Sequence, residues 1–256
     1  MQRNNKIRLS GICLLILIGL FLVPVNSNSQ NKEIDSIIEL GDDMLSLNDY
    51  DAAMEKYEKA LEMNDSYPPA IEAKIQTLIL MKKYNKAGKL VDQALSNNPY
   101  YTPFYLYKGK IEIEKEHFDE AKISLNKALD IADDPDQKTL NKIYVNLGAA
   151  YQKTGNFEKA LDLYSKSLNI NKQNPNLFIY RGYLYFKKEK YEEAIEDFKK
   201  VLELDPNNHY AQYNIGMSHY KMGNKYDAKD AFHKACELGN KNACKMLITK
   251  FINTDN

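Results

Sequence analysis

A spacing of 34 residues dominates this 256-residue chain. Gly182 is followed twelve residues later by Ala194, and the same pairing returns 34 positions further on at Gly216 and Ala228. The pairing also occurs three times upstream. Small residues allow two helices to approach closely, and one helix pair of this length cannot bury its apolar face alone. The period therefore predicts an array of stacked helix pairs rather than one compact core.

The clearest copy of this period is the stretch 175–208. Phe178 and Tyr185 recur at helical spacing in its first half, as do Ile195 and Phe198 in its second half, and Pro206 ends the second helix. This pattern resembles the tetratricopeptide repeat. The resemblance implies an all-α fold, a right-handed superhelical solenoid of antiparallel helix pairs whose first helices line a concave groove. It implies six repeats, at residues 34–67, 68–101, 102–140, 141–174, 175–208 and 209–242.

Three units depart from the pattern. Unit two has Ile75 at the glycine position, so we expect its two helices to lie further apart. Unit three is five residues longer than the others, and we interpret the extra residues near 132–138 as a longer turn. In unit five Arg181 replaces the usual leucine, and antiparallel helices would bring it close enough to Asp197 for an ion pair.

The first 29 residues differ from the repeats and are typical of a secretory signal peptide. Three basic residues precede the apolar run Ile12–Val23, and small serines precede a suitable cleavage point before Gln30. The run is shorter than the ~18–20 residues that usually span a membrane, and an uncleaved N-terminal anchor is the alternative. Residues 30–33 are expected to form a polar linker. Either outcome predicts an exported protein, periplasmic or secreted, that meets a membrane only through an uncleaved segment.

The C-terminal end carries two further features. Residues 241–253 predict an amphipathic helix that caps unit six, with Met246 and Phe251 on its apolar stripe. Cys236 and Cys244 lie on either side of this junction, which resembles cysteine-rich relatives of the tetratricopeptide fold whose neighbouring helices are stapled by cysteines eight residues apart. The resemblance implies a disulfide in an oxidising compartment, and two free thiols are the alternative.

Charge and motifs narrow the classes of function. Lys plus Arg and Asp plus Glu balance at 35 each, so the composition does not favour a nucleic-acid partner. The four histidines are scattered and no catalytic motif occurs, so we expect no enzyme activity, cofactor or metal site. The family resemblance implies a non-catalytic protein–protein interaction scaffold that binds a peptide segment of a partner. The alternatives are a carbohydrate-binding module or a structural subunit of an envelope assembly.

The resemblance also places the second, fifth, ninth, twelfth and thirteenth residues of each unit on the concave groove. In units five and six these positions are rich in aromatic residues that we interpret as surplus to the core, with lysines that favour an acidic peptide. The alternative is that the capping helix, or a general abundance of tyrosine, accounts for them. No unit has the Lys and Asn pair with which family members bind a C-terminal carboxylate. The predicted partner-binding residues are Ile179, Tyr183, Phe186, Lys187, Tyr210, Tyr213, Met217, Tyr220 and Lys221.

Overall fold

The computed structural model describes residues 27–132 and 135–252, which form thirteen α-helices, a terminal π-helical turn and no β-strand. The helices are α1 (Ser27–Ser46), α2 (Tyr50–Met63), α3 (Pro68–Leu80), α4 (Tyr84–Asn97), α5 (Thr102–Glu114), α6 (Phe118–Ile131), α7 (Gln137–Lys153), α8 (Phe157–Ile170), α9 (Pro175–Lys187), α10 (Tyr191–Leu204), α11 (His209–Lys221), α12 (Lys225–Glu237) and α13 (Lys241–Leu247), followed by the π-helical turn η1 (Ile248–Ile252).

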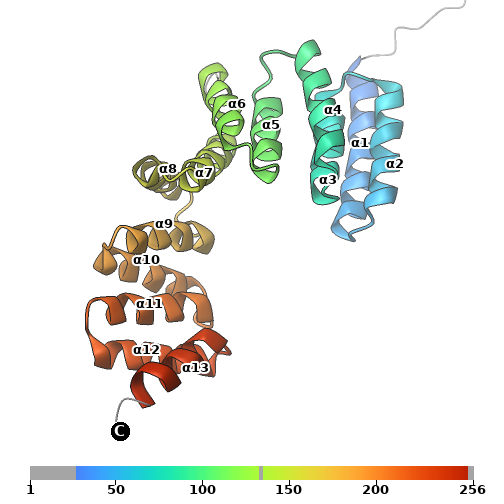
Figure 1. The fold of residues 1–256 in the computed structure, drawn as a ribbon. Coiled ribbons are helices and arrows are strands. Elements are labelled where there is room, and N and C mark those ends of the chain that lie inside the picture. Colours follow the sequence, from blue (N-terminus) through green and yellow to red (C-terminus); the bar gives the residue numbers. More distant parts are fainter. Residues whose placement is uncertain (1–26, 133–134, 253–256) are drawn as a thin grey trace, which may run out of the picture.

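Consecutive helices form antiparallel pairs, and the pairs stack into a curved array from α1–α2 at one end to α11–α13 at the other (Figure 1). Each pair is in close contact with the next, and buried side chains form a chain of adjoining clusters along the array. This is the all-α superhelical solenoid that the sequence predicts. No helix in the described ranges is long and apolar enough to cross a membrane.

The recurring glycine is the contact point within a pair. A Cβ atom on Gly148 would lie 2.6 Å from the ring of Tyr164, so no larger residue fits without displacing that ring. Unit two replaces this arrangement with Ile75 and Val91, both fully buried. The backbones of α3 and α4 lie less close together than those of the other five pairs. The predicted wider spacing of unit two is confirmed. Its first helix has the large side chain of Ile75 where the first helices of the other units have a glycine.

Four of the expected units start at the residue where a helix starts, at α3, α5, α9 and α11. The expected linker 30–33 is wrong, because these residues lie inside α1. These four residues are polar, so the sequence shows no helical pattern of apolar residues here. A contact with another helix holds them in place: the Gln30 side-chain amide donates a 3.1 Å hydrogen bond to the carbonyl of Met63. The helix also includes Ser27, so the last three residues of the expected signal segment are helical, and residues 1–26 lie outside the described residues.

The longer turn before unit four follows α6, as expected. Asp136 ends this turn, because its carboxylate accepts hydrogen bonds from the backbone and the hydroxyl of Thr139 at 2.9 and 2.6 Å. These bonds lower the pKa of Asp136. Asp136 is therefore the N-cap of α7, which begins four residues before the expected start of the unit.

The predicted ion pair of unit five is confirmed. The guanidinium of Arg181 donates two hydrogen bonds to Asp197 at 2.7 and 2.9 Å, and a third to the Ser165 hydroxyl at 3.2 Å. Asp197 is only 4% exposed, and this burial raises its pKa while Arg181 opposes the shift. The pair joins α8, α9 and α10, so it fixes two neighbouring units against each other.

The C-terminal segment covers the end of unit six, as predicted, but α13 ends at Leu247 and a π-helical turn follows it. Its apolar residues pack on α12, and the ring of Phe251 lies 6.0 Å from that of Phe232. The structure also brings Cys236 and Cys244 together, with their sulfur atoms at bonding distance and their Cα atoms 4.9 Å apart.

Candidate functional site: the concave groove

The first helices of units one to four lie side by side. Each of α1, α3 and α5 is in close contact with the next first helix in the chain. Two adjoining hollows open on the face that these helices share, with cavity volumes of about 330 Å³ and about 250 Å³. The larger is lined by α3, α5 and α7, and the smaller by α1, α3 and α5. We call their common surface the N-terminal groove, lined by Ile38, Asp42, Leu45, Pro69, Glu72, Ala73, Gln76, Pro103, Leu106, Tyr107, Lys110, Thr139, Lys142 and Asn146.

Glu72 belongs to both hollows. Its carboxylate accepts a 2.5 Å hydrogen bond from the Tyr101 hydroxyl. Burial raises the pKa of Glu72, while the hydrogen bond from Tyr101 and the charge of Lys142 oppose this shift. Burial and the nearby Glu72 charge also raise the pKa of Tyr107, so this phenol stays a neutral hydrogen-bond donor at neutral pH. Glu72 is therefore a carboxylate held in place, half-buried, at the centre of the groove.

Asp42 is the second acidic residue of the groove. It lies on α1 and is exposed, and its carboxylate accepts a 2.7 Å hydrogen bond from the hydroxyl of Tyr57. That ring is fully buried against Gly41, so Asp42 is tied to the core of its own unit. Its unit is strongly acidic, with ten acidic and two basic side chains in residues 34–67. The end of the groove near α1 therefore has a negative potential.

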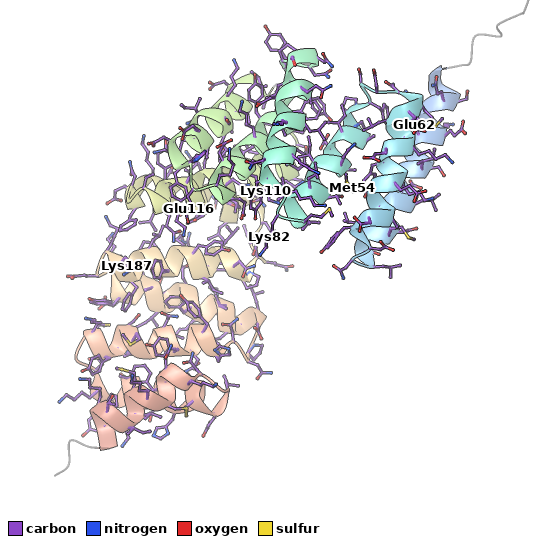
Figure 2. The ribbon with its side chains drawn as sticks, turned by 45° about the vertical axis from the view of Figure 1, so that its right-hand side comes forward. Met54, Glu62, Lys82, Lys110, Glu116 and Lys187 are labelled. Atoms are coloured by element: carbon purple, nitrogen blue, oxygen red, sulfur yellow. A yellow bond between two sulfur atoms is a disulfide. The ribbon has the colours of Figure 1, made fainter. Side chains whose placement is uncertain are left out.

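Lys110 and Lys142 give the other end of the groove the opposite charge. Neither ammonium group forms a salt bridge within the residues that the structure describes. By contrast, Lys74 and Lys108, on α3 and α5, pair with carboxylates of α2 and α4 at 2.9 and 2.8 Å. Figure 2 shows Lys110 in the N-terminal half of the arc, away from Lys187 in the other half. The two groove lysines thus differ from their neighbours in having no anion in contact.

The nine residues predicted from the sequence lie on α9 and α11, and most of them are part of the packing. The expectation that their aromatic side chains are surplus to the core is wrong for Tyr183, Phe186, Tyr213 and Tyr220, which pack against buried clusters. Tyr213, Met217 and Tyr220 pack around Phe232 beneath the C-terminal segment, and the ring of Tyr220 lies 6.1 Å from that of Phe251. The remaining half-buried members, Ile179, Tyr183 and Phe186, pack against neighbouring clusters of units four to six.

Three of the nine predicted residues are exposed: Lys187, Tyr210 and Lys221. Tyr210 is 40% exposed, and the ammonium of Lys187 lies 5.4 Å from the ring centre of Tyr183. These residues could still contact a partner, so a partner surface on α9 and α11 stays a prediction. This surface is smaller than the sequence predicted, because the other six residues pack against the C-terminal segment or the core.

Sequence reasoning missed the N-terminal groove because it weighed aromatic content alone. Glu72, Gln76 and Lys110 occupy the fifth and ninth positions of their units, where the family resemblance places groove residues. The signal that could have found them is charge: at these positions units one and two carry an acidic side chain and unit three carries a basic one. We find no group of three or more His, Cys, Asp or Glu side chains that could hold a metal in the described ranges.

Comparison with known proteins identifies the family. Models of the tetratricopeptide repeat match residues 44–67, 102–135, 142–174, 182–223 and 210–238, which together make up more than half of the chain. The chain therefore belongs to the tetratricopeptide-repeat family, whose members act as protein–protein interaction scaffolds.

Among curated proteins, the chain is similar to the mitochondrial import receptor subunit TOM70 of Rattus norvegicus and of Homo sapiens. Each is 25% identical over 122 residues, which is 47% of this chain and 19% of the relative. The match therefore spans about a fifth of the length of these curated relatives.

Two solved structures share the fold. PilF of Pseudomonas aeruginosa superposes with a TM-score of 0.74 at 18% identity, covering 86% of this chain and 98% of PilF. YrrB, described as a TPR protein with an unusual peptide-binding site, has a TM-score of 0.63 at 21% identity, covering 75% of this chain and 97% of YrrB. At these identities the likeness concerns the fold alone.

Proposed function

We propose that this protein is an exported, non-catalytic scaffold whose concave groove binds a peptide segment of a protein partner. The observation that carries the proposal is the N-terminal groove, a pair of adjoining hollows on the first helices of four consecutive units. Peptide binding is also what the description of the structural neighbour YrrB names for that protein. A groove lined by apolar residues and by a few fixed polar groups suits an extended peptide better than a flat surface would.

Export is supported by the apolar N-terminal run, and it agrees with the position of the two cysteines. In an oxidising compartment Cys236 and Cys244 would form a disulfide that ties α13 to α12. The partner is then a protein of the same compartment. An uncleaved N-terminal segment would hold the scaffold at a membrane.

Site-specific photo-crosslinking in the producing cells tests this function. A photoreactive phenylalanine analogue would replace Gln76, which is exposed in the N-terminal groove, or Ile123 on α6, which is 71% exposed outside the groove. We expect an adduct of one defined mass from position 76 and none from position 123. Equal adducts at both positions, or adducts from position 123 alone, would reject the groove as the partner site.

A further inference from the structure

The N-terminal groove carries its two kinds of charge at separate places. Asp42 lines only the smaller hollow between α1 and α5, Lys110 and Lys142 line only the larger hollow towards α7, and Glu72 lies between them and lines both. Lys142 is close enough to oppose the raised pKa of Glu72, yet the two side chains form no salt bridge. Opposite charges therefore lie near each other in the groove without forming an ion pair.

We propose that the N-terminal groove selects its peptide by charge pattern, with basic side chains against Asp42 and Glu72 and acidic side chains against Lys110 and Lys142. This inference rests on the proposed function and adds the chemistry of the partner segment. A segment of a single sign would meet repulsion at one end of the groove, whereas a segment with both signs meets attraction at both.

The apolar side chains of both hollows add to the affinity for a peptide. Leu106 lines the larger hollow, and Ile38 and Leu45 line the smaller one. Packed helix axes lie 8–10 Å apart, so four first helices extend over roughly 27 Å. An extended chain advances by about 3.3 Å per residue, so the groove accommodates about eight residues. The segment we infer is therefore short and extended, with a few apolar residues between a basic and an acidic block.

Other occupants fit the same observations less well. A purely acidic peptide would satisfy the two lysines but would meet Glu72 beside them and Asp42 at the other end of the groove. A purely basic peptide has the reverse problem. The charge pattern also differs from that of the surface on α9 and α11, where the exposed charged residues Lys187 and Lys221 are both basic.

Synthetic peptides test the inference directly. Four fluorescein-labelled 12-residue peptides with blocked termini would share one apolar centre and differ only in their flanks: lysine then aspartate, aspartate then lysine, all lysine, and all aspartate. Fluorescence anisotropy at low ionic strength would measure their affinities for the wild-type protein. We expect the better of the two mixed peptides to bind at least about tenfold more tightly than either single-sign peptide. A single-sign peptide that binds as tightly as the mixed peptides would overturn the inference.

Charge reversal within the groove provides the second arm. The double variant Lys110→Glu with Lys142→Glu should lose at least about tenfold in affinity for the mixed peptide and bind the all-lysine peptide more tightly than the wild type does. The matched control is Lys89→Glu with Lys127→Glu, which makes the same charge change at exposed positions of α4 and α6 and should bind like the wild type. Circular dichroism would establish that each variant is folded, and Lys110→Gln with Lys142→Gln replaces the reversal if it is not.

The outcomes separate the two proposals. If the mixed peptide loses no more affinity in the groove variant than in the control variant, the charge-pattern inference is wrong. The proposed function then still stands if position 76 crosslinks to a partner. If position 76 captures nothing and only position 123 does, the proposed function fails as well.

Discussion

The two halves of the concave surface use the same helix positions in different ways. At the ninth position, units one to three have Asp42, Gln76 and Lys110, which line open hollows. Units five and six have Tyr183 and Met217 there, and both pack against buried clusters. A large apolar side chain at a groove position packs against a buried cluster when one lies within reach, whereas a polar side chain stays in the groove. A residue at the ninth position of a unit is therefore not necessarily open to a partner in the groove.

The ends of the array explain part of this difference. In unit six the C-terminal segment supplies Phe251 and Met246, which pack with the aromatic residues of α11 into one cluster. In the first half, each first helix is followed by another first helix in close contact, whereas the close contacts of α9 and α11 are mainly with second helices. The first half therefore presents a continuous surface of first helices. In the second half, the side chains at the corresponding positions are covered by packing against second helices and the C-terminal segment.

The largest expected effect concerns the ion pair that holds the second half together. Replacing Arg181 by Ala leaves Asp197 buried without its cation, and we expect a loss of about 3–5 kcal/mol in the free energy of unfolding. Chemical denaturation would measure it. The double variant Arg181→Leu with Asp197→Leu should recover most of the loss, because no uncompensated charge is left. A single variant as stable as the wild type would show that the pair does not fix these units.

The next effect separates packing from binding. Tyr213→Ala and Tyr220→Ala should each lower the free energy of unfolding by about 3 kcal/mol, since both rings pack around Phe232. Gln76→Ala and Lys110→Ala, at the corresponding face of the first half, should change it by less than about 0.5 kcal/mol. Thermal melting of the four variants measures the contrast. Similar losses at all four positions would mean that the two halves do not differ in the way described.

The cysteine pair gives a smaller effect, confined to the C-terminal end. Replacing Cys236 and Cys244 by Ser should lower the stability of the exported protein by about 2.5 kcal/mol, because the cross-link restricts the unfolded chain. Peptide binding to the N-terminal groove should be unchanged. Intact-mass measurement with and without a thiol-alkylating reagent decides whether the bond exists. Two alkylated thiols in the untreated exported protein would contradict it.

The smallest effect is a pH dependence in the first half. Burial raises the pKa of Glu72 above its ordinary value of 4.5, so the folded protein binds this proton more tightly than the unfolded chain does. The stability from this proton is present below pH 4.5 and is lost as the pH rises through the raised pKa. Glu72→Gln removes that loss, so its stability relative to the wild type should increase from pH 4.5 towards neutral pH. A difference that stays constant over this range would contradict the raised pKa.

The sequence predicted most of the fold because the small and large residues that set the helix packing recur at fixed positions in each repeat. Gly148 requires close contact with the following helix, and Ile75 correctly indicated a wider pair. The start of α1 was missed because residues 27–33 are polar, and the contact of Gln30 with the carbonyl of Met63 joins residues that are distant in the sequence. Sequence also could not reveal which groove positions are open, because that depends on how adjacent first helices approach and on whether a side chain such as Tyr220 finds a cluster to join.

The central claim is that a partner peptide occupies the N-terminal groove rather than the surface on α9 and α11. A 12-residue peptide selected from a random display library against the intact protein would serve as the probe, and its affinity would be measured for two double charge reversals. We expect Lys110→Glu with Lys142→Glu to weaken binding at least about tenfold, and Lys187→Glu with Lys221→Glu to weaken it less than about threefold. The opposite order of the two effects would contradict the account and would place the partner on α9 and α11.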